Sequence, residues 1–371
     1  MTLLSPISGL ALVQDTPHSL ADGFTRFPVV DGIAFLRVGR EALAAAALAC
    51  LDRGDADGAA ALLLADQDDW WRGPAADPDA LRHLVRNRAT LRLRDAMELL
   101  AWGPVGTYFA HRWSDPTYLA GLALMQAHWA MPASAFELAC GIGHHLRRLG
   151  QEGVAVAGGD VVFAKLWVAR HFVVPEARLV CFDAAHPWPM AGQRFDLVAC
   201  HDAFYFLEPK PAIAAALRGL LSAGGTLVIG HVHNRDWPNL SAGAAVTAAE
   251  LAALFPDALA YDDAELTRAL VEARAPEPAA WADLGAVEAF SLAEGRTHGP
   301  HPLAGGLALP RPEATLVRNP LYGDDGRIAW PSERYQREYG PRATYPARAT
   351  THEPNEALVR RREFVDLPDR W

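Results

Sequence analysis

The chain has few cysteines and no excess of basic residues. Its 371 residues include four cysteines, and none of them forms a Cys-x-x-Cys pair, so neither a disulfide framework nor a zinc site of the usual spacing is expected. Lys and Arg total 34 against 44 Asp and Glu, which gives a formal net charge of -10. A general nucleic-acid-binding protein needs a basic surface, so that class is not expected.

Long hydrophobic runs are also missing. The longest apolar run, residues 42–51, is too short to cross a bilayer. The first residues lack a basic segment followed by an apolar stretch, so no signal peptide is predicted. Since 51% of the residues are hydrophobic and 21% are charged, we expect a packed fold. These features favour a cytoplasmic protein without a membrane partner.

Apolar spacing divides the chain into four segments. Residues 1–40 are rich in turns and strand-like, and residues 41–132 have helical spacing interrupted by Gly and Pro. In residues 133–295, short apolar runs alternate with helical patterns, as they do in buried parallel strands joined by helices. Residues 296–371 are rich in Pro, Arg and aromatic residues, and we expect an extended tail.

The third segment predicts a doubly wound α/β sheet, because its apolar runs have the length of buried strands. Thr247, followed three residues later by Glu250, predicts a capping box at the start of a helix. The predicted strands are residues 135–138, 154–157, 179–182, 195–200 and 226–230, with residues 257–261 and 286–292 as closing strands.

The first of these runs ends in an acidic residue and a glycine-rich turn. Glu137 is followed by Ala139, Gly141 and Gly143. Glycine lets the backbone turn sharply and approach a ligand closely, and the N-terminus of the helix that follows would face that ligand. The segment is therefore suited to receive a nucleoside.

Two further carboxylates follow the second and third runs. In open α/β sheets, ligands bind at the carboxyl ends of the strands, so Asp160 is placed to accept both hydroxyls of a ribose. Asp183 can accept from an adenine amino group, with Phe182 or Val161 against the ring. For any one of these carboxylates, the alternative is a helix cap.

Together, these motifs from Phe136 to about Asn234 resemble the class I S-adenosylmethionine-dependent methyltransferase domain. Residues 195–200 and 220–229 are similar to its fourth-strand motif and to the helix, turn and fifth strand that follow. The resemblance implies a mostly parallel, seven-stranded Rossmann-like sheet, with S-adenosyl-L-methionine as cofactor and S-adenosyl-L-homocysteine as product. The cofactor-binding residues that it implies are Glu137, Ala139, Cys140, Gly141, Gly143, Asp160, Val161, Phe182, Asp183, Ala184 and His201.

The chain departs from that family in two places. Ala139 stands where the family has its first glycine, and no Asn/Asp-Pro-Pro-Tyr segment follows the fourth strand. Methylation of amino groups on nucleobases or glutamine is therefore not indicated. A dinucleotide-binding oxidoreductase is the rival within this fold, but residues 144–146 lack the later glycine of G-x-G-x-x-G.

The N-terminus carries a second resemblance. Residues 3–9 and 26–33 look like the small zinc-ribbon-like activator subunit of RNA and protein methyltransferases. That family has Cys-Pro where this chain has Ser5 and Pro6, and its zinc ligands are absent here. The resemblance implies a degenerate, structural β-rich module without metal.

The chemistry is expected in residues 200–206, after the fourth strand. His201 suits a general base, because a histidine titrates near neutral pH; a hydrogen-bonded histidine at a strand end is the alternative. A metal site joining it to His231 and His233 is not predicted, since no carboxylate pattern lies near them. The catalytic candidates are His201, Asp202 and Tyr205. The substrate-binding candidates are His144, Trp102, Tyr108, His111, Trp113, His231 and His233, and core packing is the alternative for the aromatic residues.

Our leading hypothesis is a methyltransferase that acts on a small molecule, with oxygen slightly favoured as acceptor and residues 41–132 as a helical lid. The alternative is a catalytically silent protein of the same fold that acts as a binding or assembly partner. Methylation of RNA or protein is a third option, which the acidic charge balance disfavours. A homodimer is left open.

Overall fold

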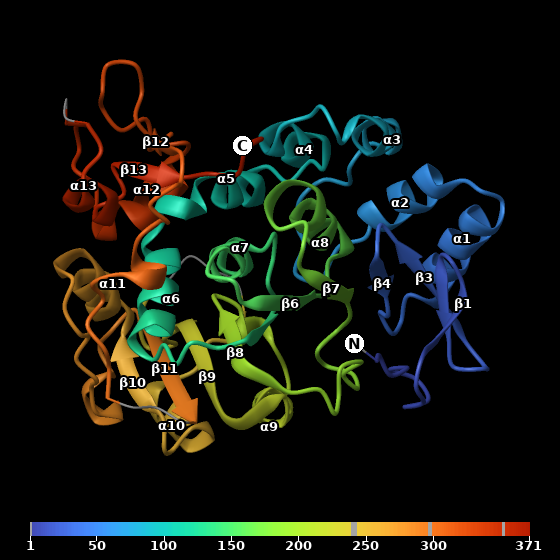
Figure 1. The fold of residues 1–371 in the computed structure, drawn as a ribbon, viewed down its shortest axis with the longest axis horizontal. Helices are drawn as coiled ribbons and strands as arrows, with labels where there is room; N and C mark the ends of the chain where they lie inside the picture. The colour runs from blue at the N-terminus through green and yellow to red at the C-terminus, as the bar shows by residue number, and fades with distance from the viewer. Residues whose placement is uncertain (1, 239–242, 296–298, 351–352) are drawn as a thin grey trace.

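The computed structural model describes residues 2–238, 243–295, 299–350 and 353–371. Met1 of the predicted first segment and residues 296–298, where the predicted tail starts, lie outside the described residues. Within the described chain, the centre of the molecule is an 11-stranded sheet with helices on both sides (Figure 1). No helix in these ranges combines the length and the apolar character that crossing a bilayer requires.

Seven consecutive strands form the predicted doubly wound sheet. Their spatial order is β7-β6-β5-β8-β9-β11-β10, and all neighbours pair in parallel except at β11, which is antiparallel to both β9 and β10. Strand order reverses between β5 and β8, so the carboxyl end of β5 lies at the switch point where such sheets bind ligands. The strands are β5 (Ser134–Leu138), β6 (Ala155–Asp160), β7 (Arg178–Cys181), β8 (Phe195–His201), β9 (Leu221–His233), β10 (Leu259–Asp262) and β11 (Ala289–Gly295).

Four N-terminal strands extend this sheet at its β7 edge, shown in blue in Figure 1. They form an antiparallel meander whose last strand runs parallel to β7, with Ala34 opposite Val180 and Phe35 opposite Cys181. The module therefore covers a strand edge that would otherwise be open to pairing. Its strands are β1 (Val13–Thr16), β2 (Ser19–Ala21), β3 (Arg26–Val30) and β4 (Ile33–Phe35).

Helices cover the two faces unequally. The first face carries α1 (Glu41–Asp52), α2 (Ala56–Leu64), α3 (Pro78–Asn87), α4 (Leu93–Leu99), α5 (Pro104–His111), α6 (Pro116–Ala127), α7 (His144–Gln151), α8 (Phe163–Val168) and α11 (Asp263–Glu272). The second face carries α9 (Lys210–Gly219) and α10 (Ala248–Leu254). Residues 41–132 therefore lie almost wholly on one side of the sheet.

Alternation along the strands explains why both faces are apolar. In β5, Ala135 packs into the core on one face, and its neighbour Phe136 packs into the core on the other. Strands buried on both sides have continuous apolar runs for this reason. The capping box is confirmed at α10, where Thr247 accepts from the N–H of Glu250.

The C-terminal segment folds back over the helical face. It contains β12 (Leu316–Arg318), β13 (Phe364–Asp366), α12 (Glu333–Tyr339) and α13 (Glu356–Arg360). Arg147 of α7 donates to both carboxylate oxygens of Asp366, at 2.9 Å each. The C-terminus lies beside α4 and α5 in Figure 1, where the N–H of Leu93 donates to the carbonyl of Arg370. The tail thus bonds both to the helical segment, at Leu93, and to α7, which packs on the sheet.

The position of Phe35 yields a test of the N-terminal module. Phe35 of β4 is fully buried and contacts the ring of Phe163 in α8. We expect Phe35→Ala to lower the free energy of unfolding of the whole chain by about 3–5 kcal/mol, the usual cost of removing a buried ring. Chemical denaturation measures it. Phe24→Ala in the same module is the control, since Phe24 is 87% exposed. An unchanged unfolding midpoint for Phe35→Ala would contradict a module that is integral to the sheet.

Candidate active site

The loop after β5 has a backbone that few side chains tolerate. Ala139, Gly141 and Gly143 have φ angles of +53°, +56° and +85°. The N–H of Cys140 donates to the carbonyl of Gly159 at 3.1 Å, which ties the loop to the end of β6. The loop then leads directly into α7, so three left-handed residues lie between the strand and the helix at the switch point.

Asp160, the last residue of β6, lies against this loop. One of its carboxylate oxygens accepts from the N–H of Gly141 at 3.0 Å, and the other accepts from the N–H of Val162 at 2.9 Å. The ammonium group of Lys165 lies 3.7 Å away. Asp160 is 4% exposed, so its charge is balanced within the protein.

The residues predicted to face an adenine ring follow β6 and β7, whose ends are joined where the N–H of Phe182 donates to the carbonyl of Asp160 at 3.1 Å. The buried ring of Phe182 lies so close to Gly159 that a Cβ at that glycine would come within 2.3 Å of it. Asp183 is partly exposed and accepts from the N–H of Ala185 at 2.9 Å. Ala184 is buried, and Val161 is half-buried.

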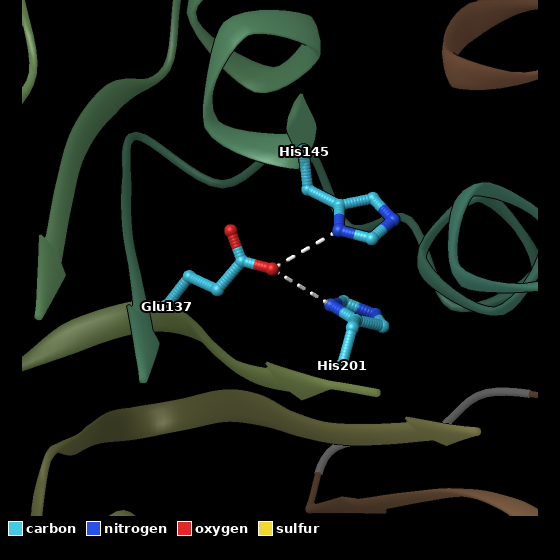
Figure 2. Close-up of side chains that lie close together, drawn as sticks. All are labelled: Glu137, His145 and His201. Carbon is cyan, nitrogen blue, oxygen red and sulfur yellow. Dashed lines mark hydrogen bonds and ion pairs between the residues drawn. The ribbon is translucent and has the colours of Figure 1, made fainter. Parts of the chain in front are cut away.

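Glu137 lies at the centre of a buried cluster with two histidines (Figure 2). One of its carboxylate oxygens accepts from Nδ1 of His145 at 3.0 Å and from Nδ1 of His201 at 3.2 Å. The two imidazole rings lie 4.1 Å apart between centroids. A Cβ at Gly121 of α6 would come within 2.6 Å of His145, so the cluster is enclosed beneath α6.

Charge in this cluster is set by burial and by the hydrogen bonds. Burial raises the pKa of Glu137, but the charges and hydrogen bonds of His145 and His201 outweigh it and lower the pKa to about 2. Burial, together with the neighbouring His201, lowers the pKa of His145 to about 4. Near neutral pH, Glu137 is therefore a carboxylate and His145 is a neutral imidazole.

A second polar cluster surrounds Asp202, the residue after β8. Arg112 and Tyr108 both donate to one oxygen of its carboxylate, Arg112 at 2.8 Å, and Tyr205 donates to the other at 2.8 Å. Burial raises the pKa of Asp202, but the charges of His231 and Arg112 outweigh burial and hold the pKa below its usual value, so the carboxylate is ionised. The carboxylate of Asp202 thus links α5, through Tyr108, to the carboxyl ends of the strands.

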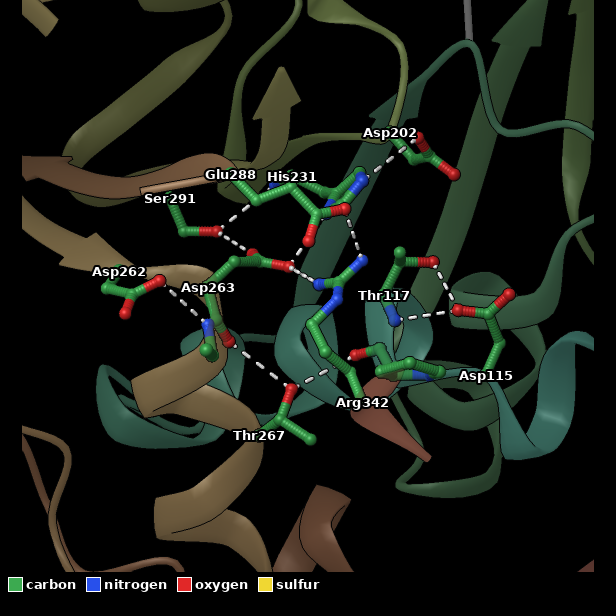
Figure 3. A network of polar contacts seen from close by, with 12 residues as sticks. Asp115, Thr117, Asp202, His231, Asp262, Asp263, Thr267, Glu288, Ser291 and Arg342 are labelled. Carbon is green, nitrogen blue, oxygen red and sulfur yellow. Dashed lines mark hydrogen bonds and ion pairs between the residues drawn. The ribbon is translucent and has the colours of Figure 1, made fainter. Parts of the chain in front are cut away.

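His231 connects this cluster to the second half of the sheet (Figure 3). Its Nδ1 lies 2.7 Å from a carboxylate oxygen of Asp263, and Ser291 donates to the other oxygen of that carboxylate at 2.7 Å. Arg342 from the tail lies 3.6 Å from Asp263 and donates to Glu288 at 3.0 Å. Nε2 of His231 faces Asp202 at 4.0 Å.

The predicted substrate-binding residues separate into two groups. Tyr108, His231 and His233 join the cluster around Asp202. The others pack into apolar surroundings: Trp102 is 1% exposed in the core, His111 lies between Tyr335 and Trp371, and Trp113 packs against His144.

α5 lies over the glycine loop. A Cβ at Gly141 would come within 3.2 Å of the ring of Phe109, and His144 is bonded to the carbonyl of Phe109 at 3.0 Å. These contacts, and the roles of Arg112, Asp263 and Arg342, were not predicted. Asp263 and Arg342 are far along the chain from their partners, and no local pattern marks them.

Known proteins are similar to part of the chain. Residues 136–229 match the model of a family described as a methyltransferase domain. No curated protein matches the chain. The chain covers only 50–53% of the length of the first solved structures that it matches.

Three solved structures illustrate the extent of the likeness. SAM-bound CalS10, an amino pentose methyltransferase from Micromonospora echinaspora, has 28% identity over 33% of this chain and 53% of its own, with a TM-score of 0.29. Haemonchus contortus phosphoethanolamine N-methyltransferase 2 has 16% identity over 56% and 61%, with a TM-score of 0.40. A complex of the Haloferax volcanii Trm112 methyltransferase activator with a methyltransferase has 20% identity over 41% and 70%, with a TM-score of 0.34.

The loop geometry predicts a stabilising substitution. A left-handed conformation costs a residue with a Cβ about 1–2 kcal/mol, whereas glycine at Ala139 would lose about 0.5–1 kcal/mol through the flexibility of the unfolded chain. We expect Ala139→Gly to raise the free energy of unfolding by about 0.5–1 kcal/mol in chemical denaturation.

Ala215→Gly is the matched control for that substitution. Ala215 is exposed in the interior of α9, where the same change should destabilise the chain by about 1 kcal/mol. Equal losses of stability in the two variants would contradict the strained loop.

Proposed function

We propose that this chain, whose residues 136–229 are a class I methyltransferase domain, transfers a methyl group to a small-molecule acceptor, with oxygen favoured as the acceptor atom. S-adenosyl-L-methionine is the cofactor of such a domain and supplies an electrophilic methyl group on sulfur. One observation supports the proposal most strongly: the left-handed loop 139–143 and Asp160 meet at the switch point of the sheet.

The residues at the switch point fit this cofactor. The loop offers a backbone surface in which a side chain at Gly141 or Gly143 would be strained. Each oxygen of the Asp160 carboxylate has a second lone pair beyond the backbone N–H that it already accepts. In our proposal Asp160 holds the ribose hydroxyls, and Phe182 and Asp183 lie at the adenine end.

α5 is the lid in this proposal. Phe109 covers Gly141, while Tyr108 and Arg112 from the same segment bind Asp202. Displacement of this segment would open the glycine loop and the polar cluster together. Its return would exclude water from both, which strengthens the electrostatic interactions in the site.

The acceptor site in this proposal is the cluster around Asp202, with His201 as the general base. Glu137 fixes the orientation of His201 by holding Nδ1. Nε2 of His201, which has no hydrogen-bond partner among the described residues, is then the nitrogen that takes a proton from an acceptor hydroxyl. Arg112 and Tyr108 would orient the acceptor through Asp202.

The alternative is the catalytically silent protein of the same fold. It is favoured by the enclosure of the loop, since Phe109 covers Gly141 and Asp160 is bonded within the protein. The two hypotheses differ in whether the folded chain binds the cofactor.

The first test is binding of S-adenosyl-L-homocysteine, measured by isothermal titration calorimetry. We expect micromolar affinity for the parent chain. Asp160→Asn should weaken it about 10- to 100-fold, because a charge-assisted hydrogen bond contributes about 1.5–3 kcal/mol. Asp324→Asn, at an exposed position, is the control that leaves affinity unchanged. A folded parent chain that shows no binding would favour the silent protein, and equal affinity in Asp160→Asn would refute the ribose assignment.

The second test concerns His201 and uses an acceptor identified by screening hydroxylated small molecules for methyl transfer. His201→Asn should lower kcat about 100-fold or more, the range of general-base catalysis, with affinity for S-adenosyl-L-homocysteine within about twofold of the parent. His186→Asn, on a half-exposed side chain, controls for loss of a histidine. Full turnover in His201→Asn would remove His201 from the base role.

A further inference from the structure

Two histidines of β9 and one carboxylate after β8 converge at the acceptor side of the sheet. One ligand atom from each of Asp202, His231 and His233 lies within 4.8 Å of the other two. Asp202 and His231 are neighbours because Gly230 pairs with His201 between β8 and β9, and the N–H of Asp202 donates to the carbonyl of Gly230 at 2.9 Å. We propose that Asp202, His231 and His233 bind a divalent transition-metal ion such as Zn²⁺, Mn²⁺ or Fe²⁺.

The spacing between Asp202 and His231 suits an ion better than a hydrogen bond. Their nearest oxygen and nitrogen are 4.0 Å apart, which is too long for a hydrogen bond. Zinc binds carboxylate oxygen and imidazole nitrogen at about 2.0–2.2 Å in a tetrahedral site, so two of its ligands lie about 3.4 Å apart. The observed 4.0 Å therefore leaves room for an ion after the two side chains move slightly closer. Two imidazoles and a carboxylate form a donor set typical of divalent transition metals.

His231 already has the outer partner that metal-binding histidines require. Such histidines use their second ring nitrogen to bond a carboxylate, which fixes the ring and leaves the first nitrogen free for the ion. Asp263 holds Nδ1 of His231 at 2.7 Å, and Ser291 orients Asp263 in turn (Figure 3). Nε2 is therefore the free nitrogen, and it faces Asp202.

His233 and Asp202 complete the argument. His233 is 5% exposed, and its Nδ1 has no hydrogen-bond partner within the described residues, a costly state for a buried polar atom unless a ligand satisfies it. Tyr205 and Arg112 hold the two oxygens of Asp202 in place. Asp202 and His231 each have a φ of +52°, a strained conformation that clusters at ligand sites.

The cluster around Glu137 is the internal comparison, since it also contains two histidines and a carboxylate. Its separations of 3.0 and 3.2 Å are ordinary hydrogen bonds. Glu137 itself accepts from Nδ1 of both histidines there, so among the described residues no second carboxylate orients either ring in the way that Asp263 orients His231. We therefore assign the ion to Asp202, His231 and His233 and not to this cluster.

The test measures metal binding alone, and it goes beyond the proposed methyl transfer because it requires neither cofactor nor acceptor. The full chain, stripped with a chelator and dialysed, is titrated with Co²⁺ while its visible absorption is recorded, and bound Zn²⁺ is counted by mass spectrometry. We expect one equivalent. His231→Ala and His233→Gln should remove it, and Asp263→Asn should weaken it about 10- to 100-fold. His145→Ala, in the Glu137 cluster, should retain it.

Circular dichroism shows whether each variant is folded. If His231→Ala does not fold, the conservative variant His233→Gln still tests the site. No bound metal in the folded parent chain would overturn the proposal. Metal retained in His233→Gln but lost in His145→Ala would also overturn it, because the ion would then occupy the Glu137 cluster. Failure of methyl transfer with metal binding intact would refute only the proposed function.

Discussion

Buried carboxylates at one edge of a parallel sheet are the constraint on which the site depends. Glu137, Asp160 and Asp202 all lie at the carboxyl ends of β5, β6 and β8, and their side chains are nearly excluded from solvent. An ionised group in such a place is stable only when partners compensate its charge. The sequence meets this demand differently each time: two imidazoles for Glu137, backbone N–H groups and Lys165 for Asp160, and Arg112 with two phenols for Asp202.

The partners of Asp202 include Tyr108 and Arg112, which are about 90 residues away in the sequence, so segments outside the part that matches a methyltransferase domain belong to the site. α5 supplies Tyr108 and covers Gly141 through Phe109. The tail supplies Arg342 beside Asp263 and stacks Tyr339 on Tyr108. The N-terminal module contributes at the other end of the sheet, where β4 covers the edge of β7. A domain of 94 matched residues is thus enclosed by segments that the family model does not include.

The sheet could be predicted from sequence because its signals are local. Continuous apolar runs, the glycine-rich loop and the carboxylates at strand ends lie within a few residues of each other, so β5 to β9 and the positions of Glu137 and Asp160 follow directly. The pairing of β4 with β7, the Asp263–His231 contact and the cover of Phe109 over Gly141 arise from tertiary packing between distant segments. For the same reason, the carboxylates that lie beside His231 and His233 in the structure are far from these histidines in the sequence, and no local pattern predicts them.

A crystal structure of the full chain grown with S-adenosyl-L-homocysteine tests the central claim most directly. Our account predicts electron density for the nucleoside across residues 139–143, with its ribose at Asp160 and α5 displaced from Gly141. Density at another place, or an unchanged contact between Phe109 and Gly141 with no ligand at saturating concentration, would contradict it.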